Sequence, residues 1–250
     1  MRQWRGWQRL AIGLLVLGLS GCASVRGTPD PRDPWEGYNR AMFEFNDAVD
    51  RAVLKPAAKG YRAITPKAVD DSVSNFFSNL GDIPNALNNA LQGKFVRSLQ
   101  DINRVVYNTT FGIGGLFDVA SHMGLPKSNE DFGQTLGVWG VDAGPYLVLP
   151  ILGPSTLRDT GGRVVDGYTH PMRAIDDETL MWSLAVLRAI DIRADLLDVE
   201  KRVDEVAFDR YITIRNGYLD RREFLVHDGN PPRSEEDDLL RELERIESGG

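Results

Sequence analysis

Apolar residues recur at helical spacing along most of the chain. From residue 33 onward they repeat at i, i+4 and i+7, the period of helices with one apolar face. In the first such run, Asp33 is positioned as an N-cap with Pro34 at the first helical position, and Pro56 is expected to end the helix. Its apolar face comprises Tyr38, Met42, Phe45, Val49 and Ala52.

Three further helical runs follow. Residues 65–81 predict a second helix, and residues 82–93 predict a brief third one that Asp82 caps and Gly93 ends. Residues 94–110 predict a longer helix. On that helix the apolar side carries Phe95, Leu99, Ile102 and Val106, while Arg104 and Asn108, four residues apart, share one face.

Glycine replaces the helical period in the middle of the chain. Residues 111–156 are rich in glycine and show no sustained apolar repeat. A helix is expected to resume around Pro171, and residues 181–228 predict one or two long amphipathic helices. We therefore expect a mostly α-helical protein with at most a short hairpin inside residues 136–150.

The last segment, residues 230–250, predicts an acidic linker followed by a terminal helix. Ser234 can cap that helix, and the acids in its first turn suit the positive end of the helix dipole. A narrow apolar stripe is typical of a helix that binds in a partner's groove. The alternative is that this segment is a solvated tail without a partner. The stripe consists of Leu239, Leu243 and Ile246.

The N-terminus has the organisation of an export signal. A stretch with three arginines and no acid precedes twelve weakly polar or apolar residues, too few for a membrane span. Cys22 is the only cysteine, so it has no partner for an intramolecular disulfide or a cysteine metal cluster. Leu-Ser-Gly-Cys resembles the lipobox of bacterial lipoproteins, which predicts removal of residues 1–21, lipidation of Cys22 and a tether over residues 22–32. A signal anchor is the alternative.

Charge and composition restrict the partners. The chain of 250 residues is 42% hydrophobic and 26% charged, a balance that allows a globular core. Loss of residues 1–21 moves the formal charge from −7 to −10, because that segment holds three arginines and no acid. Such a charge argues against nucleic acid and against electrostatic adhesion to anionic lipid. Any contact with a membrane must be hydrophobic.

The sequence holds no common catalytic motif. Serine-hydrolase, zinc-protease and P-loop patterns are absent, and His122, His170 and His227 lack metal-ligand spacing. Gly-Ile-Gly-Gly at residues 112–115 lacks the lysine of a phosphate loop, so backbone packing explains it better. The adjacent pair Arg158 and Asp159 is interpreted as a structural ion pair, with a polar opening as the alternative. We expect no enzyme activity, cofactor or metal.

Residues 137–156 are apolar, irregular and rich in glycine and proline. Exposed to water, they would form a large apolar patch. In lipid, irregular backbone persists only where protein buries it or where it lines a cavity. The segment is therefore expected to line or plug a cavity.

Three stretches together resemble one family. DPWEGYNRAMFEFND, NTTFGIGGLFDVA and DFGQTLGVWGVDAGPYLVLPILGPSTLRDTGG are similar to motifs of the MlaA/VacJ family of outer-membrane phospholipid-transport lipoproteins. The likeness extends from Asp33 to Arg222, in order, behind a lipobox. It implies that residues 33–229 form a ring-like assembly of amphipathic helices in the inner leaflet of the outer membrane, around a central amphipathic channel.

The resemblance also implies roles for individual residues. Residues 137–150 would be a glycine-rich hairpin beside the channel, in which Asp142 replaces a glycine usual in the family. The aromatic face of residues 38–46 would lie at the membrane or channel rim, or else in the core. Implied channel and hairpin residues are Gly137, Val138, Trp139, Gly140, Val141, Gly144, Pro145, Tyr146, Leu147 and Leu149. Implied scaffold residues are Asn39, Phe43, Phe45, Asn46, Arg104, Asn108, Asp118, Arg158 and Asp159.

The function implied by this family is removal of mislocalised phospholipid from the outer leaflet. Lipid would pass through the channel to a periplasmic carrier, MlaC, and return to the inner membrane, which maintains lipid asymmetry. Trimeric porins would be partners in the outer membrane. The alternative is a structural lipoprotein that braces a porin or tethers the envelope, and the missing nucleophile motif argues against a phospholipase.

Overall fold

The computed structural model describes residues 30–232, which form helices and one two-stranded hairpin. The elements in order are α2 (Glu36–Val49), η1 (Asp50–Leu54), α3 (Lys55–Ile64), α4 (Lys67–Leu91), α5 (Phe95–Thr110), α6 (Val119–His122), α7 (Phe132–Val138), β1 (Tyr146–Leu149), β2 (Gly153–Thr156), α8 (Leu157–Thr169), η2 (Pro171–Ala174), α9 (Glu178–Asp195), α10 (Leu197–Val206) and α11 (Arg210–Val226). The predicted mostly helical fold is confirmed. Cys22 and the terminal stripe of Leu239, Leu243 and Ile246 lie outside the described residues.

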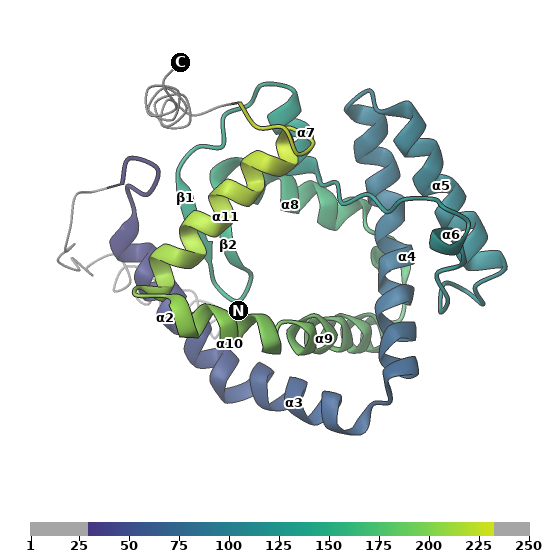
Figure 1. The fold of residues 1–250 in the computed structure, drawn as a ribbon, viewed down its shortest axis with the longest axis horizontal. Coiled ribbons are helices and arrows are strands. Elements are labelled where there is room, and N and C mark those ends of the chain that lie inside the picture. The colour runs from purple at the N-terminus through teal and green to yellow at the C-terminus, as the bar shows by residue number, and fades with distance from the viewer. Residues whose placement is uncertain (1–29, 233–250) are drawn as a thin grey trace, which may run out of the picture.

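The elements follow one another around the periphery of the view in Figure 1. Helices α2 and α3 run along the lower edge, α4 rises on the right with α5 beside it, and α7 and α8 lie at the top. The hairpin and α11 occupy the left, and α9 and α10 run across the lower part of the view from α4 toward α11. Segments from both halves of the chain are therefore neighbours, as in the packing of α3 against α9.

The first helix differs from the sequence prediction at both ends. Asp33 does not cap it: helix α2 begins at Glu36, and the buried Asp33 carboxylate instead binds side chains of α2 and α11. Nor does Pro56 end it, because a π-helical turn, η1, joins α2 directly to α3. Pro56 sits in the first turn of α3, where a missing N–H is tolerated.

Helix α4 is one continuous element rather than two. It passes through Gly81 and Pro84 without interruption, so the predicted break and cap at Asp82 are wrong. The Asp82 side chain is fully buried and paired with Arg104 of α5, which leaves no carboxylate free to cap. Packing against α5 around Pro84 outweighs the local cost of the proline.

Helix α5 lies where the sequence predicts it, but it exposes its apolar side and buries its polar side. Its apolar stripe of Phe95, Leu99, Ile102 and Val106 is between 47% and 67% exposed. Its polar face, which is buried against α4 and α6, consists of Ser98, Asp101, Arg104 and Asn108.

The glycine-rich middle contains more regular structure than its sequence predicts. Residues 111–156 include two short helices, α6 and α7, and α8 follows at once, although none of these three was predicted. The hairpin also lies later than the predicted residues 136–150, because β1 pairs antiparallel with β2 in the register Tyr146 to Thr156 and Leu149 to Gly153. Likewise, residues 181–228 hold parts of three helices rather than one or two.

The apolar core is small and mostly aromatic. Tyr146 and Val148 of β1 pack with Tyr211 of α11, and Phe43 of α2 contacts the Tyr211 ring edge-on at 5.7 Å. A second cluster joins Ala58 of α3 to α9 and α10. Buried polar and charged residues are far more numerous than these, so the interior is largely polar. No helix within residues 30–232 has both the length and the hydrophobicity to cross a bilayer.

Candidate functional site

Two asparagines of α2 hold the hairpin in place. The Asn39 amide donates to the carbonyl of Tyr146 at 3.0 Å and accepts from the N–H of Val148 at 2.8 Å. At the end of β1, the Asn46 amide donates to the Leu149 carbonyl and accepts from the Ile151 N–H, at 2.9 and 2.6 Å. Seven residues apart on one helix face, these two amides satisfy backbone groups that an edge strand would otherwise leave unpaired.

Asp33 connects this clamp to α11. Its carboxylate accepts from the Asn39 amide at 2.7 Å, from Arg215 at 3.1 Å and from the Tyr211 hydroxyl. Burial, together with the neighbouring Asp33 carboxylate, raises the pKa of Tyr211. The hydroxyl therefore stays protonated and donates, so that the hairpin, α2 and α11 form one hydrogen-bonded unit.

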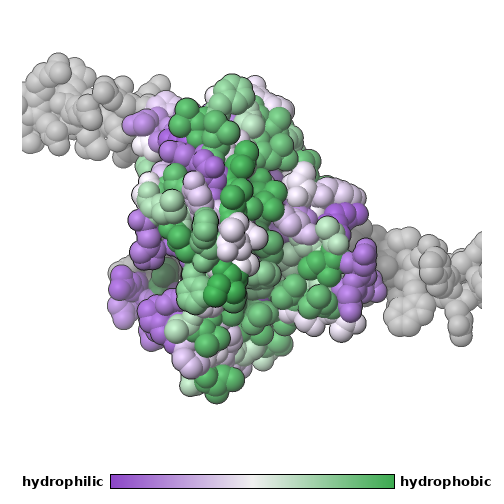
Figure 2. Space-filling model, turned by 90° about the vertical axis from the view of Figure 1, so that its right-hand side faces the viewer, coloured by the Kyte–Doolittle hydropathy of each residue, from purple (hydrophilic) through white to green (hydrophobic). Residues whose placement is uncertain are grey.

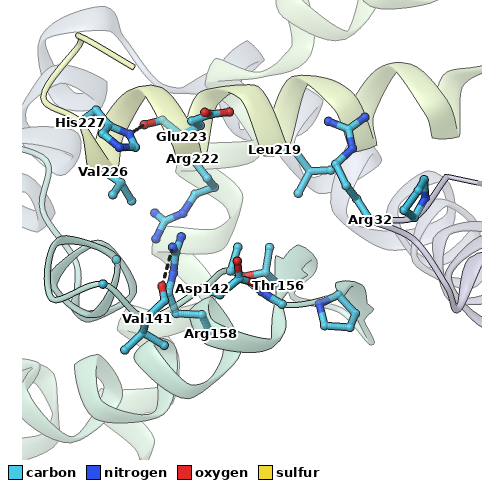
Figure 3. Close-up of a pocket in the computed structure, with 16 residues that line it drawn as sticks. Arg32, Val141, Asp142, Thr156, Arg158, Leu219, Arg222, Glu223, Val226 and His227 are labelled. Carbon is cyan, nitrogen blue, oxygen red and sulfur yellow. Dashed lines mark hydrogen bonds between the residues drawn. The ribbon is translucent and has the colours of Figure 1, made fainter. Parts of the chain in front are cut away.

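A cavity of about 710 Å³ lies beside the segment that precedes the hairpin (Figure 3). Arg222 and Leu219 of α11 line one side, and residues 140–145 with Arg158 line the other. Figure 3 shows Arg222 and Arg158 reaching toward each other from α11 and α8. The Arg158 guanidinium also donates to the Val141 carbonyl at 3.4 Å.

Arg222 organises the wall of this cavity. Its guanidinium binds Asp159 of α8 at 2.8 and 2.9 Å and Asp131, the N-cap of α7, at 2.5 and 2.9 Å. Burial alone would raise the pKa of both carboxyl groups, but the hydrogen bonds and charge of Arg222 hold those pKa values below their ordinary range. Both carboxylates stay ionised, so three helices meet at one arginine.

Close helix packing explains two glycines around this arginine. A Cβ added to Gly162 of α8 would lie 2.4 Å from the backbone nitrogen of Gly133 in α7. A Cβ added to Gly133 would lie 2.7 Å from an Asp159 oxygen and 2.8 Å from an Arg222 nitrogen. Only glycine fits at these two positions, since both neighbours are backbone or fixed ion-pair atoms.

A second ion network fixes α4, α5 and α6. Arg104 is fully buried and donates to Asp82 at 3.1 Å, to both Asp118 oxygens at 3.1 Å and to the Leu125 carbonyl at 2.8 Å. Asn108 donates to Asp118 at 3.1 Å. Burial opposes ionisation of Asp118, but the hydrogen bonds of Ser121, Arg104 and Asn108 outweigh it and lower its pKa to about 2.

An apolar cavity of about 480 Å³ lies under the tip of the hairpin. Its rim is closed by ion pairs between helices that are distant in sequence: Arg193 binds Asp50 at 2.6 Å and Glu200 at 2.6 Å, and Arg210 binds Asp47 at 2.7 Å. The apolar wall consists of Phe43, Leu54, Val148, Ile151, Pro154, Leu196, Val199 and Ile214.

The outer surface over α4, α5 and α6 is strongly apolar. Figure 2 shows this side of the molecule, where hydrophobic residues cover much of the face. Besides the α5 stripe, the exposed apolar side chains of these elements and their connections include Ile83, Leu87, Leu91, Phe111, Ile113, Leu116 and Phe117.

The residues predicted for the channel and hairpin fall into three groups. Gly137, Gly140, Val141, Gly144 and Pro145 line the cavity of Figure 3. Val138 and Trp139 are exposed, Tyr146 is buried in the aromatic core, and Leu147 and Leu149 are half-buried on β1.

The predicted scaffold residues also separate by position. Asn39 and Asn46 bind the hairpin, Phe43 packs in the core, and Phe45 is exposed. Arg104, Asn108 and Asp118 are brought together in one network. The ion pair of Arg158 with Asp159 is present at 3.1 Å, but Arg222 is the stronger partner of Asp159.

Sequence reasoning missed several residues of these networks: Asp33, Asp131, Tyr211, Arg215 and Arg222. Asp131 carried a usable signal, because an aspartate before an apolar run marks a helix start, and its side chain does cap α7 through the Gln134 N–H at 2.8 Å. The partners on α11 lie up to 182 positions away, and no local pattern joins them.

The structure defines a class of helical protein with a polar interior, an apolar outer face and a clamped hairpin beside two cavities. Within that class the chain belongs to the MlaA lipoprotein family, whose model matches residues 31–225.

Relatives and a solved structure support this membership. The intermembrane phospholipid transport system lipoprotein MlaA of Haemophilus influenzae is 36% identical over 92% of this chain and 96% of its own length. The protein of that name from Escherichia coli K12 is 36% identical over 88% and 90%. A structure described as the basis for maintenance of bacterial outer membrane lipid asymmetry is 37% identical and has a TM-score of 0.69, covering 78% of this chain and 98% of that one.

Proposed function

We propose that this protein is a passive conduit that removes phospholipid from the outer leaflet of the outer membrane and so maintains lipid asymmetry. Its helices would surround a channel, and the lipid would pass to a periplasmic carrier, MlaC, for return to the inner membrane. The names of the relatives and the description of the similar structure support this role. In this proposal the protein transports lipid and catalyses no reaction.

The distribution of polarity is the observation that carries the proposal. In water, a protein buries its apolar side chains, yet α5 exposes its apolar stripe and buries Arg104 and Asp101. Such an arrangement is stable where acyl chains surround the outside. The face in Figure 2 is therefore proposed to lie in the lipid of one leaflet, because a helix that lies in the membrane needs no spanning length.

The two cavities beside the hairpin suit the two parts of a phospholipid. The apolar cavity under the hairpin tip offers aliphatic walls to an acyl chain. The cavity of Figure 3 has a mixed polar and apolar lining that includes Arg158 and Arg222, so a charged head group can find polar contacts there. The hairpin separates the two, and its asparagine clamp keeps that partition in place.

The lipobox at Cys22 supports anchoring to the inner leaflet of the outer membrane. Acyl chains on Cys22 would hold the protein at the membrane, since more than one chain gives stable attachment. A trimeric porin is proposed as the partner in that membrane. The terminal stripe at residues 239–246 is proposed to bind the carrier; carrier capture that survives deletion of residues 233–250 would contradict this.

The experiment measures phospholipid exposed on the cell surface in a deletion strain that is complemented with variants. Val199→Trp fills the apolar cavity, whereas Val186→Trp is the control, since Val186 is a similarly exposed valine on α9 that lines neither cavity. Gly144→Trp is a poorer block, because Gly144 has a φ of +65° that strains any L side chain. We expect surface phospholipid to rise on deletion, and Val186→Trp but not Val199→Trp to restore the low level.

The exposed apolar face also fits a porin wall, which favours a bracing lipoprotein as the second candidate. A brace needs its outer surface and its anchor but not its cavities. If Val199→Trp and Val186→Trp both restore the low level of surface phospholipid while a Cys22 variant does not, bracing is the better account.

A further inference from the structure

A third cavity, of about 400 Å³, lies between α4, the end of α8 and α9. Arg188, Asp191 and Asp195 of α9 line one wall, and Ser74 and Phe77 of α4 line another. The proposed function uses neither these residues nor this cavity.

Arg188 is a half-buried cation without a counter-ion. Among residues 30–232, no carboxylate oxygen lies within 4.0 Å of its guanidinium, and its one hydrogen bond runs to Nε2 of His170 at 2.9 Å. Burial lowers the pKa of Arg188, and the more distant charge of Asp191 offsets this effect only in part. The aromatic ring of Phe77 lies 5.9 Å from the guanidinium carbon.

His170 cannot satisfy Arg188 fully. Its Nδ1 faces the backbone N–H of Met172 at 3.3 Å, and its Nε2 faces Arg188, so a donor approaches each ring nitrogen. A neutral imidazole accepts at only one nitrogen, and burial and Arg188 both lower the pKa of His170, which keeps the ring neutral. One donor therefore lacks an acceptor, whichever tautomer forms. The cluster is short of negative charge and of acceptors.

The opposite deficit occurs one turn along α9. Asp191 is 4% exposed and accepts only from the hydroxyls of Tyr61 and Ser74, at 3.3 and 3.1 Å; no cation within the described chain comes within ion-pairing distance. Burial raises the pKa of Asp191 and of Asp195, and nearby carboxylates add to the effect, while Lys67 and Arg62 oppose it at Asp195. At Asp191 this end of the cavity is short of positive charge.

The remaining charges in the wall are already engaged. Lys127 pairs with Asp82 at 3.4 Å, Glu130 with Lys94 at 3.3 Å and Asp131 with Arg222, while Asp166 accepts the N–H of Phe132 at 3.1 Å. Elsewhere in the interior Asp82 meets Arg104, Asp159 meets Arg222 and Asp33 meets Arg215, while Asp101 accepts from the Asn89 amide at 2.8 Å. In the α9 cavity a cation and a carboxylate share one wall, and within the described chain neither has an ion-pair partner within 4.0 Å.

We propose that this cavity binds a zwitterionic phospholipid head group of the phosphoethanolamine type. The phosphate accepts from Arg188 and from the His170 cluster, and the primary ammonium donates to Asp191 and Asp195. Side chains three residues apart on a helix have Cβ atoms about 5–6 Å apart, which suits two opposite charges joined by a short linker. This inference rests on the proposed function, because it assumes that phospholipid enters the protein.

Two head groups with identical short acyl chains test the proposal on the full-length protein in detergent. Phosphatidylethanolamine carries both charges, whereas phosphatidylglycerol carries only the phosphate. We expect the wild type to bind the ethanolamine lipid roughly tenfold more tightly, the size of one charge-assisted hydrogen bond. Asp191→Asn should abolish this preference, while Arg188→Gln should weaken both lipids roughly tenfold.

The surface ion pair of Arg97 with Asp228 supplies the matched controls, since its side chains are 52% and 35% exposed and line no part of this cavity. Arg97→Gln and Asp228→Asn should leave both affinities unchanged. Equal binding of the two lipids by the wild type, or unchanged affinity in Arg188→Gln, would overturn the proposal. Unchanged affinity in Arg188→Gln is the result expected if Arg188 rotates to pair with Asp191 when lipid approaches, in which case Arg188 does not bind the phosphate.

A measurement on the wild type alone covers the case in which the variants do not fold. The ratio of ethanolamine to glycerol head groups among copurified lipids should exceed that ratio in the membrane of origin, and an equal ratio overturns the proposal. Failure here is distinct from failure of the proposed function. In the first case the wild type still clears surface phospholipid without head-group preference, and in the second its deletion leaves surface phospholipid unchanged.

Discussion

The two sides of the molecule are stabilised in opposite ways. On the side formed by α2, the hairpin and α11, aromatic rings pack together in the interior, as in a water-soluble protein. On the side formed by α4, α5 and α6, the interior is an ion network around Arg104 and the apolar residues face outward. Polar interiors gain little from burial, so the second side depends on complete pairing of its charges.

This difference determines which kind of substitution destabilises each side. The aromatic side is sensitive to loss of packing and of single hydrogen bonds. The ionic side is sensitive to an unpaired charge. Its apolar surface adds little to the stability of the fold and instead determines what the protein contacts.

The largest effect is expected from Arg104→Met. This change removes a fully buried cation from Asp82, which keeps only Lys127 at 3.4 Å, and from Asp118, and breaking such a buried network typically costs about 3–5 kcal/mol. Denaturant unfolding in detergent measures the loss. The control is Arg97→Met, since Arg97 of the same helix pairs with Asp228 at the surface and such pairs contribute under about 1 kcal/mol. Equal losses for the two variants would contradict the importance of the buried network.

A smaller loss is expected on the aromatic side from Asn39→Ala. The change strands the Tyr146 carbonyl and the Val148 N–H, and each unsatisfied buried group costs about 1–3 kcal/mol. The same unfolding assay should show a loss of roughly 2–4 kcal/mol, together with faster hydrogen exchange at Val148. Protection at Val148 that stays at the wild-type level would show that the hairpin needs no clamp from α2.

The ionic side should also respond to acid. The pKa of Asp118 in the folded protein, about 2, lies below the ordinary value of 3.8, so its ionised form stabilises the fold above pH 3.8. That stability is lost as the pH falls from about 4 toward 2, and with allowance for solvent screening it amounts to about 1–2 kcal/mol. Unfolding free energies at about pH 6 and about pH 2 measure it. Asp118→Asn should show a flatter pH dependence, and an unchanged slope would refute the assignment.

The smallest effect on the fold is expected from Leu99→Ser on the outer face of α5. Leu99 is largely exposed, so its loss should change the unfolding free energy in detergent by about 0.5 kcal/mol or less. Flotation with phospholipid vesicles should nevertheless decrease, because the substitution removes apolar contact with lipid. A large loss of stability with normal flotation would mean that α5 packs against protein instead.

Sequence periodicity identified the helices but not which way they face. The stripe of Phe95, Leu99, Ile102 and Val106 has the same period whether it meets a core or a bilayer. What distinguishes the two cases is the opposite face, where Asp101, Arg104 and Asn108 have partners in α4 and α6. Those partners come from other parts of the chain, so the period alone could not decide.

Helix α8 and strand β2 were not predicted, because both depend on contacts with other parts of the chain. Helix α8 contains three glycines, which lower helix propensity, yet Gly162 is needed where α8 touches the backbone of α7. Strand β2 reads Gly-Pro-Ser-Thr and has no apolar alternation, because its buried Ser155 and Thr156 face hydrogen-bonding partners. In β1, by contrast, alternate residues Tyr146 and Val148 are buried, as local pattern predicts.

The π-helical turn η1 has a consequence for the angular phase of the helix that it interrupts. An α-helix advances by about 100° per residue, and a π turn holds more residues than an α turn, so each surplus residue rotates everything beyond it by that angle. In the present phase Asp50 faces Arg193, and Ala58 and Tyr61 face α9. Deleting one residue within 50–54 would let the helix become regular and would turn α3 away from α9, although no side chain in either contact had changed.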